Sequence, residues 1–468
     1  MADTSYNSES LSQIEIRSID YVPPEERHGT IRDQFTLWFG LNAVLFFVVL
    51  GGVPVLLGVN FLWSTIAIVV GVVIGLGMAA FHALQGPRLG VPQMIQSRAQ
   101  FGFYGAVLFF AAFIPLDVGF LAAQLVIQGQ AMNVLIGSIS IPAWIGILSI
   151  PVVVLTIYGY NWIRLWQRWM TPILATTFAV LIVQAIRFGG LDGHAARTGA
   201  PSVALFMESA GLFVISMAAW APYVSDYTRY LPASVNKAKL FWAVFLGCAI
   251  ATIATAVLGA YVTALLPEAS STVAAVQQVA GSWALPIMAL SLVGADAAVA
   301  YTGMLALASI ISCFKDVRSS KTMRVLGSLL IIALGTGCAL LGYKSFVNNL
   351  SNFLAVVLFI FIPWTAINLT DYFVVRHGEY DVPSFFTPHG EYGGFVWRGL
   401  ISYALAVAVE LPFISQTYYT GPLLGPLGGI DISWVVGGVA GVVFYLIAIR
   451  LPMRGSPQPL TGIPRSWF

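Results

Sequence analysis

The chain has 468 residues, of which 58% are hydrophobic and only 9% are charged. A soluble protein of this length needs a far more charged surface, so the composition excludes a soluble enzyme or binding domain and predicts an integral membrane protein. The formal net charge of +2 gives no indication of a nucleic-acid partner. No phosphate-binding loop of the Gly-Lys-Ser/Thr type is present, which argues against an ATP-driven machine.

Twelve apolar windows follow one another along the chain, each long enough to cross a hydrocarbon core of about 30 Å. The polar residues 1–36 predict a cytoplasmic arm without a cleavable signal peptide. Residues 376–396 predict a cytoplasmic loop, and 452–468 a cytoplasmic tail. The predicted membrane helices cover 37–57, 61–83, 105–135, 142–162, 166–187, 203–230, 239–265, 283–313, 323–343, 350–375, 397–415 and 431–451.

The basic residues indicate how these windows are oriented. With the N-terminus inside, all but three of the 22 Lys and Arg residues fall on the cytoplasmic side; the exceptions are Arg187, Arg197 and Lys344. Cytoplasmic loops of membrane proteins carry such an excess. The sequence therefore predicts a multi-pass protein of the plasma or inner membrane, in contact with lipid, with both termini in the cytoplasm.

Two windows are interrupted by glycine and proline. The window 37–57 contains Gly40 and the run Gly51-Gly52-Val53-Pro54, and the window 203–230 contains Gly211 and Pro222. A helix in lipid loses backbone hydrogen bonds only where protein, water or a ligand replaces them. Broken helices at matching places in two halves of a chain are typical of the binding site of a secondary transporter.

The two interrupted windows are five apart, which predicts an internal repeat. Residues 37–187 and 203–375 would each form a five-helix unit. Because five is odd, the second unit enters the membrane from the opposite side, as the charge distribution requires. We expect an all-α membrane fold of two inverted repeats, with 397–451 as two accessory helices.

Ionisable residues inside a membrane are costly and are candidates for function. Asp296 lies mid-window among small residues, and we favour a role in substrate or proton binding over a purely structural one. Asp117 is a possible member of the same site. Glu410 lies in an accessory helix, where a structural or oligomeric role is the better interpretation.

Aromatic and amide residues supply a second set of candidates. Phe120 and Gln124 are four residues apart and share a helix face. An aromatic plane one turn from an amide is able to stack on a flat polar ring and hydrogen-bond its edge. Plain packing is the simpler interpretation of Phe120. Trp220 precedes Pro222 at the second break and is either a packing tryptophan or a wall of the site.

Catalytic patterns are missing from the sequence. The five histidines are scattered, and neither a nucleophile elbow nor a zinc cluster is present. We therefore expect no enzymatic activity, no metal and no cofactor.

Four sequence blocks resemble the nucleobase–cation symporter-1 family, which includes the purine–cytosine permeases. They run in order from about residue 15 to 380. The blocks are the arm I-D-Y-V-P-P-E-E-R-H-G leading to L-W-F-G-L-N-A, then G-P-R-L-G-V-P-Q-M-I-Q-S-R-A-Q-F-G-F-Y-G, W-A-P-Y-V-S-D-Y-T-R-Y-L-P and P-W-T-A-I-N-L-T-D-Y-F. The resemblance implies a leucine-transporter-like fold and cation-coupled uptake of a flat heterocycle by alternating access.

By position, the resemblance implies that the first membrane helix unwinds from Gly40 to Leu45. The carbonyls of Gly40 and Ala43 would line a cation site, and Val44 and Leu45 the substrate. Phe120, where relatives usually carry tryptophan, and Gln124 would hold the ring from the third helix. Trp220 would hold it from the sixth.

The eighth helix departs from the family pattern. Ala295-Asp296 replaces an Asn-Asn pair of many relatives, and a carboxylate cannot donate a hydrogen bond as an amide does. Asp296 would then bind ring N–H groups or a cationic ligand, or carry the coupling proton. At the hydroxyl positions of the sodium site only Ser291 is polar, since Leu290 is apolar. This pattern weakens the case for Na⁺ and strengthens that for H⁺, and both stay open as the coupling cation.

We therefore expect a symporter for a nucleobase or a related nitrogen heterocycle, of the cytosine, purine or allantoin type. A cationic or vitamin-like heterocycle of the pyridine or thiamine type is the alternative. A channel or substrate sensor on the same scaffold is the rival from another class, but the sequence contains no signalling domain. The oligomeric state stays open.

Overall fold

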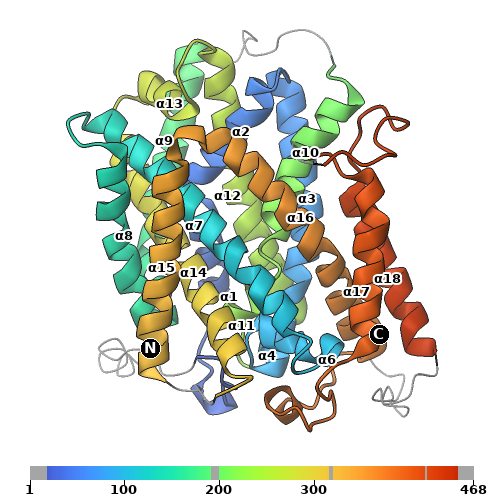
Figure 1. Ribbon diagram of the computed structural model, residues 1–468. Helices are drawn as coiled ribbons and strands as arrows, with labels where there is room; N and C mark the ends of the chain where they lie inside the picture. Colours follow the sequence, from blue (N-terminus) through green and yellow to red (C-terminus); the bar gives the residue numbers. More distant parts are fainter. Residues whose placement is uncertain (1–17, 191–199, 316–319, 417–418, 452–468) are drawn as a thin grey trace.

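A computed structural model describes residues 18–190, 200–315, 320–416 and 419–451, and these ranges are predominantly helical (Figure 1). Short helices lie between the long ones. In chain order the helices are α1 Ile31–Asn42, α2 Leu45–Leu56, α3 Phe61–His82, α4 Gln85–Leu89, α5 Gln93–Gln96, α6 Arg98–Phe101, α7 Val107–Leu135, α8 Ile141–Tyr158, α9 Tyr160–Gly189, α10 Val203–Ala218, α11 Val224–Thr228, α12 Lys237–Leu265, α13 Thr272–Ala280, α14 Ala284–Ile311, α15 Lys321–Gly342, α16 Phe346–Thr370, α17 Trp397–Glu410 and α18 Ser433–Arg450.

Each of the twelve predicted windows contains a helix. Within the described residues, eight helices are long and apolar enough to cross a membrane, and α1 with α2 forms a ninth candidate, bent by 51°. The apolar helices at Val203–Ala218 and Phe359–Val375 are shorter. The multi-pass architecture is therefore confirmed, whereas the number of exactly twelve spans and the domain boundaries stay predictions.

The break in the first span is narrower than predicted and lies in one place only. The helix ends at Asn42, Ala43 and Val44 are non-helical, and α2 begins at Leu45. The prediction of unwinding from Gly40 to Leu45 was therefore too wide, because Gly40 lies within α1. The prediction of a second interruption at Gly51–Pro54 was wrong, because α2 continues through these residues.

Gly51 is needed for packing. A Cβ atom on Gly51 would meet the backbone of Ala256 in α12, and one on Gly259 of α12 would meet the backbone of Val48 in α2. The two backbones therefore touch, as small residues allow in membrane helix pairs. This contact fixes α2, which begins at the break, against α12.

The break in the sixth span was predicted correctly at Pro222. Helix α10 ends at Ala218, and residues 219–223 form tight turns before α11 begins at Val224. Proline has no N–H group to continue the helical ladder. Instead, Trp220 N–H donates to the Met217 carbonyl (3.1 Å) and Tyr223 N–H to that of Trp220 (2.9 Å). The predicted interruption at Gly211 was wrong, since Gly211 lies inside α10.

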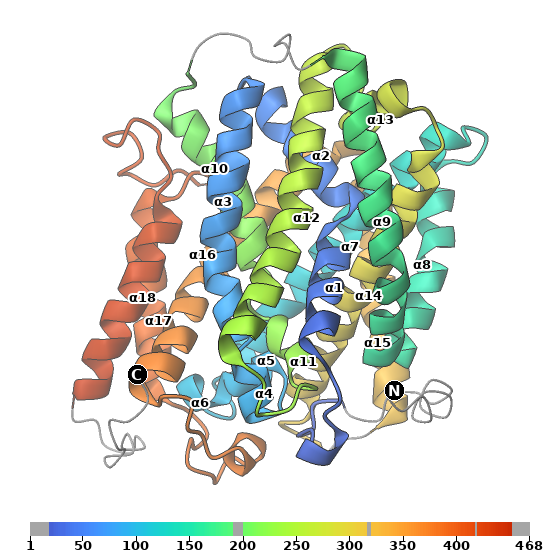
Figure 2. The same ribbon diagram turned by 180° about the vertical axis from the view of Figure 1, so that it is seen from behind.

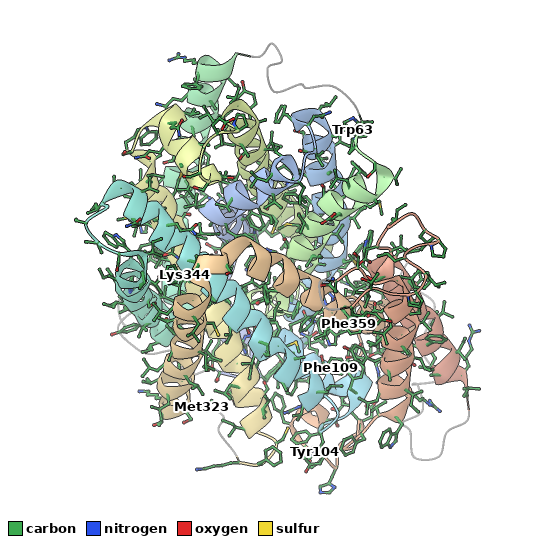
Figure 3. The ribbon with its side chains drawn as sticks, turned by 45° about the horizontal axis from the view of Figure 1, so that its top comes forward. Trp63, Tyr104, Phe109, Met323, Lys344 and Phe359 are labelled. Carbon is green, nitrogen blue, oxygen red and sulfur yellow. The ribbon has the colours of Figure 1, made fainter. Side chains whose placement is uncertain are left out.

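The accessory helices stand at one edge of the molecule. Helix α17 packs on α18, and both contact α16; α17 also contacts α6 (Figures 1 and 2). In Figure 3, Met323 and Lys344 mark the two ends of α15, and Phe359 of α16 lies beside the accessory pair. At the lower end of Figure 1, residues 18–22 join α4 and α11: Val22 N–H donates to the Gly90 carbonyl (2.8 Å), and Arg229 donates to that of Ser18 (2.9 Å).

Candidate substrate and cation site

A small cavity of about 20 Å³ lies between the two broken spans. Its walls come from the break regions and from α7 and α14, and they are almost entirely apolar. The lining residues are Leu41, Val44, Phe46, Phe47, Phe120, Gln124, Ser216, Ala219, Trp220, Tyr223 and Val299. Four of the predicted substrate residues, Val44, Phe120, Gln124 and Trp220, therefore meet at one place.

Five of the eleven lining residues are aromatic. Phe120 of α7 makes edge-to-face contacts with Phe46 (6.0 Å between ring centroids) and Phe353 of α16 (5.1 Å). On the other side Trp220 contacts Tyr223 (5.2 Å) and Trp38 (5.4 Å). A volume of 20 Å³ holds about one water molecule. A heterocycle therefore requires these rings to move apart.

Gln124 brings a polar group into this apolar wall. Its side chain is buried, and its Oε1 atom has no hydrogen-bond partner among the described residues. A buried amide without a partner costs about 1–3 kcal/mol. A ligand in the cavity that donates a hydrogen bond would recover this energy.

Asn42 joins the two breaks and was not predicted. Its Oδ1 accepts from the Trp220 indole (3.1 Å) and from Thr252 of α12 (3.3 Å), and its Nδ2 donates to the Trp38 carbonyl (2.8 Å). This fully buried amide thus orients Trp220. The available sequence signal was its place in the block L-W-F-G-L-N-A, within the predicted first break.

Asp296 lies behind the cavity wall. It is fully buried on α14, where Gln128 of α7 donates to its Oδ2, while Oδ1 has no partner among the described residues. Gln128 is one turn after Gln124, and Val299, one turn after Asp296, lines the cavity. The carboxylate is thus about one helical turn from the cavity, and Gln128, which the sequence analysis missed, holds it.

Asp117 reaches the same cavity through a tyrosine. Its Oδ1 accepts a hydrogen bond from the hydroxyl of Tyr223, and its Oδ2 lies next to Gly303 of α14. Tyr223 lines the cavity at the second break. Asp117 is fully buried and therefore couples α7 to the non-helical segment of the sixth span.

The predicted cation residues surround the first break. Because α1 ends at Asn42, the carbonyls of its last residues, from Gly40 to Asn42, have no intrahelical partner, and that of Ala43 lies in the break itself. The hydroxyl of Ser291 on α14 accepts from Leu45 N–H (3.3 Å) and donates to the Met288 carbonyl (2.6 Å). Leu45 itself is buried outside the cavity lining. Within the part of the chain that the structure describes, no group of three His, Cys, Asp or Glu side chains is arranged to hold a metal ion.

Glu410 is far from this site. It is the last residue of α17 and fully buried, and a Cβ atom on Gly437 of α18 would meet both its carboxyl group and Pro363 of α16. It therefore lies where the accessory helices contact α16.

Residues 21–437 match the family model described as "Permease for cytosine/purines, uracil, thiamine, allantoin". The chain belongs to this permease family. It is 35% identical over 458 residues to the putative purine-cytosine permease YxlA of Bacillus subtilis, with 95% of this chain and 98% of the relative covered. The purine-cytosine permease FCY2 of Saccharomyces cerevisiae is 30% identical over 252 residues, covering 53% of this chain and 47% of that protein.

The solved structures agree on the fold. Mhp1, a nucleobase-cation-symport-1 family transporter, in a closed conformation with bromovinylhydantoin bound, superposes with a TM-score of 0.74 at 20% identity and covers 92% of this chain and 94% of that one. Its inward-facing conformation gives a TM-score of 0.67. The permease thus has the leucine-transporter-like fold with inverted repeats, as predicted, and it is a secondary transporter and not an enzyme.

Proposed function

We propose that this permease imports a nucleobase or a related nitrogen heterocycle of the cytosine, purine or allantoin type. The observation that carries the proposal is the cavity between the broken spans, where Phe120, Trp220 and Gln124 meet and the Gln124 amide oxygen has no partner among the described residues. A flat polar ring matches this set, because two aromatic side chains stack on its faces and an amide binds its edge.

The ring would lie between Phe120 and Trp220, with Gln124 at its polar edge and the backbone at Val44 and Leu45 beside it. Asn42 would keep the Trp220 indole in place. Tyr223 and Asp117 would couple occupancy of the cavity to the second break. Because both breaks line one cavity, closing of the site around the ring would be transmitted to both repeats, as alternating access requires.

Cation coupling would use the first break. The carbonyls of Gly40 and Ala43, together with Ser291, would bind the coupling cation. Asp296 would contact the ligand or carry a proton; its hydrogen bond with Gln128, one turn after the cavity residue Gln124, supports this role. We further propose a plasma or inner membrane location with both termini in the cytoplasm, on the basis of the distribution of Lys and Arg.

A cationic or vitamin-like heterocycle is the second candidate. Asp296 and Asp117 are both buried near the cavity, and a positively charged ring would be favoured by an ionised carboxylate. Vitamin B6 transporter TPN1 of Saccharomyces cerevisiae is 26% identical over 266 residues, covering 53% of this chain and 44% of that protein. A pyridine-type substrate is therefore the alternative to a neutral nucleobase.

Uptake measurements test these two candidates. Cells that lack their own permeases would express the protein, and uptake of cytosine, purines, allantoin, hydantoin, pyridoxine and thiamine, radiolabelled in turn, would be measured in competition with the unlabelled others. Competition by neutral nucleobases alone supports the first candidate, and competition by the charged or pyridine compounds alone supports the second. No uptake of any of them would contradict both. Proteoliposomes with separate Na⁺ and pH gradients identify the coupling ion.

A further inference from the structure

A buried glutamine of the fifth span lies against the first break. Gln167 is on α9 and fully buried. A Cβ atom on Gly40 of α1 would meet its Oε1, and one on Gly294 of α14 would meet its Nε2. The amide is thus wedged between the two helices that carry the proposed cation residues, and the glycines make room for it.

The neighbouring contacts fix this arrangement. Thr171, one turn after Gln167, donates to the carbonyl of Thr36 in α1 (2.8 Å) and also lies next to Gly40. Gly294 is one turn after Ser291, and Gly40 is one turn before Ala43. Gln167 therefore lies within about one turn, roughly 5 Å, of each of these cation residues.

The amide of Gln167 is not satisfied by the protein. Neither its Oε1 nor its Nε2 has a hydrogen-bond partner among the described residues, and the indole N–H of the adjacent Trp166 has none either. Buried side-chain polar groups nearly always have a partner, and each exception requires an explanation. Next to Gln167, the backbone carbonyls of Gly40 and of the residues after it also lack intrahelical partners.

We propose that Gln167 is a ligand of the coupling cation and that this cation is Na⁺. The inference rests on the proposed function of a cation-coupled permease. It adds a ligand from α9 to those of α1 and α14, and it names the ion. The Oε1 atom would complete a set formed by the carbonyls of Gly40 and Ala43 and the hydroxyl of Ser291. It would supply the oxygen that Leu290 cannot, since Leu290 is apolar and 41% exposed.

The chemistry of the donor set favours Na⁺. Carbonyl, amide and hydroxyl oxygens are hard ligands that suit hard cations. All four are neutral, so they bring no negative charge to balance a divalent ion in a buried site. None of them takes up a proton near neutral pH, so this set does not provide a proton-binding group. Na⁺ bound here would hold α1, α9 and α14 together.

Thermal unfolding of the purified full-length protein in NaCl, KCl or choline chloride at equal ionic strength tests the proposal. We expect NaCl alone to raise the melting temperature, in a concentration-dependent manner, because an ion that binds only the folded state stabilises it. Gln167→Leu should weaken the apparent Na⁺ affinity about tenfold or more, since one of the ligands is lost. Gln167→Glu, which keeps an oxygen at this position, should retain the Na⁺ response.

Gln184→Leu is the matched control. Gln184 is also on α9, with a buried amide oxygen that lacks a partner among the described residues, but it lies about five turns away. Its replacement should leave the Na⁺ response unchanged. If Gln167→Leu does not fold, Gln167→Met, an apolar side chain of similar length, takes its place.

Two results would overturn the proposal: a wild-type protein that responds equally to Na⁺, K⁺ and choline, or a Gln167→Leu protein with the same Na⁺ response as Gln184→Leu. Binding of the heterocycle panel to the same preparations tests the proposed function separately. If Na⁺ stabilises the protein through Gln167 but no heterocycle binds, the cation-site proposal is supported and the proposed substrate class is contradicted.

Discussion

The close approach of α2 and α12 makes Gly51 sensitive to a single added methyl group. In Gly51→Ala the new Cβ would lie 1.9 Å from the carbonyl oxygen of Ala256, whereas real Cβ atoms essentially never come closer than 3.0 Å. The two helices must therefore part by about 1 Å. The clash is with backbone atoms, so no change of rotamer relieves it.

The energetic cost follows from two opposing effects. Overpacking costs about 1–3 kcal/mol, and alanine is favoured over glycine within a helix by about 0.5–1 kcal/mol. A net loss of about 1–2 kcal/mol is expected. Because α2 begins at the break, the shift also displaces Val44 and the cavity wall, so transport should fall more than the amount of protein in the membrane.

Melting temperature and uptake per surface molecule measure these two effects. Gly77→Ala in α3 is the control, because a Cβ atom on Gly77 meets nothing within 4 Å. It should be as stable as the wild type or slightly more so. A Gly51→Ala protein with wild-type melting temperature and uptake would refute the backbone contact and restore the interpretation of Gly51 as a flexible point.

Three further predictions concern the cavity. Phe120→Ala should raise the transport KM well before it lowers surface expression, since one stacking contact of about 1 kcal/mol is lost; an unchanged KM in a well-expressed mutant would remove Phe120 from the site. Gln124→Leu should weaken heterocycle binding to purified protein about tenfold or more, and wild-type affinity would show that Gln124 does not bind the polar edge of the ring. Asp296→Asn should weaken heterocycle binding while leaving the response to Na⁺ unchanged, because the amide keeps the shape but loses the carboxylate that would contact the ligand; wild-type affinity would make Asp296 structural.

Much of the site was accessible from the sequence because its signals are local. Phe120 and Gln124 share a helix face by their spacing, and Pro222 lacks the N–H group that continues a helix, although α2 continues through Pro54, which lacks it too. The meeting of Phe120 with Trp220 at one cavity does not follow from the correspondence of the two repeats. The resemblance to a known family implied it by position.

Other parts of the site depend on partners that are distant in the sequence. Gln128 and Asp296 are 168 positions apart, and Asn42 and Trp220 are 178 apart. No local pattern marks a glutamine in an apolar helix as the holder of a particular carboxylate. Gln167 was missed for the same reason, since its surroundings come from α1 and α14.

The sequence by itself determined the class of the protein, because apolar windows and the distribution of charge reflect the energy of each residue in lipid or water. It also determined that both halves contain a broken helix. Only the tertiary structure decided where the first break lies. Glycine permits an unwound backbone and also permits two helices to touch, and the sequence cannot distinguish these uses at Gly51 and Gly40. The packing of α2 on α12 and of Gln167 on α1 keeps both glycines helical, and the break falls between them, at Ala43 and Val44.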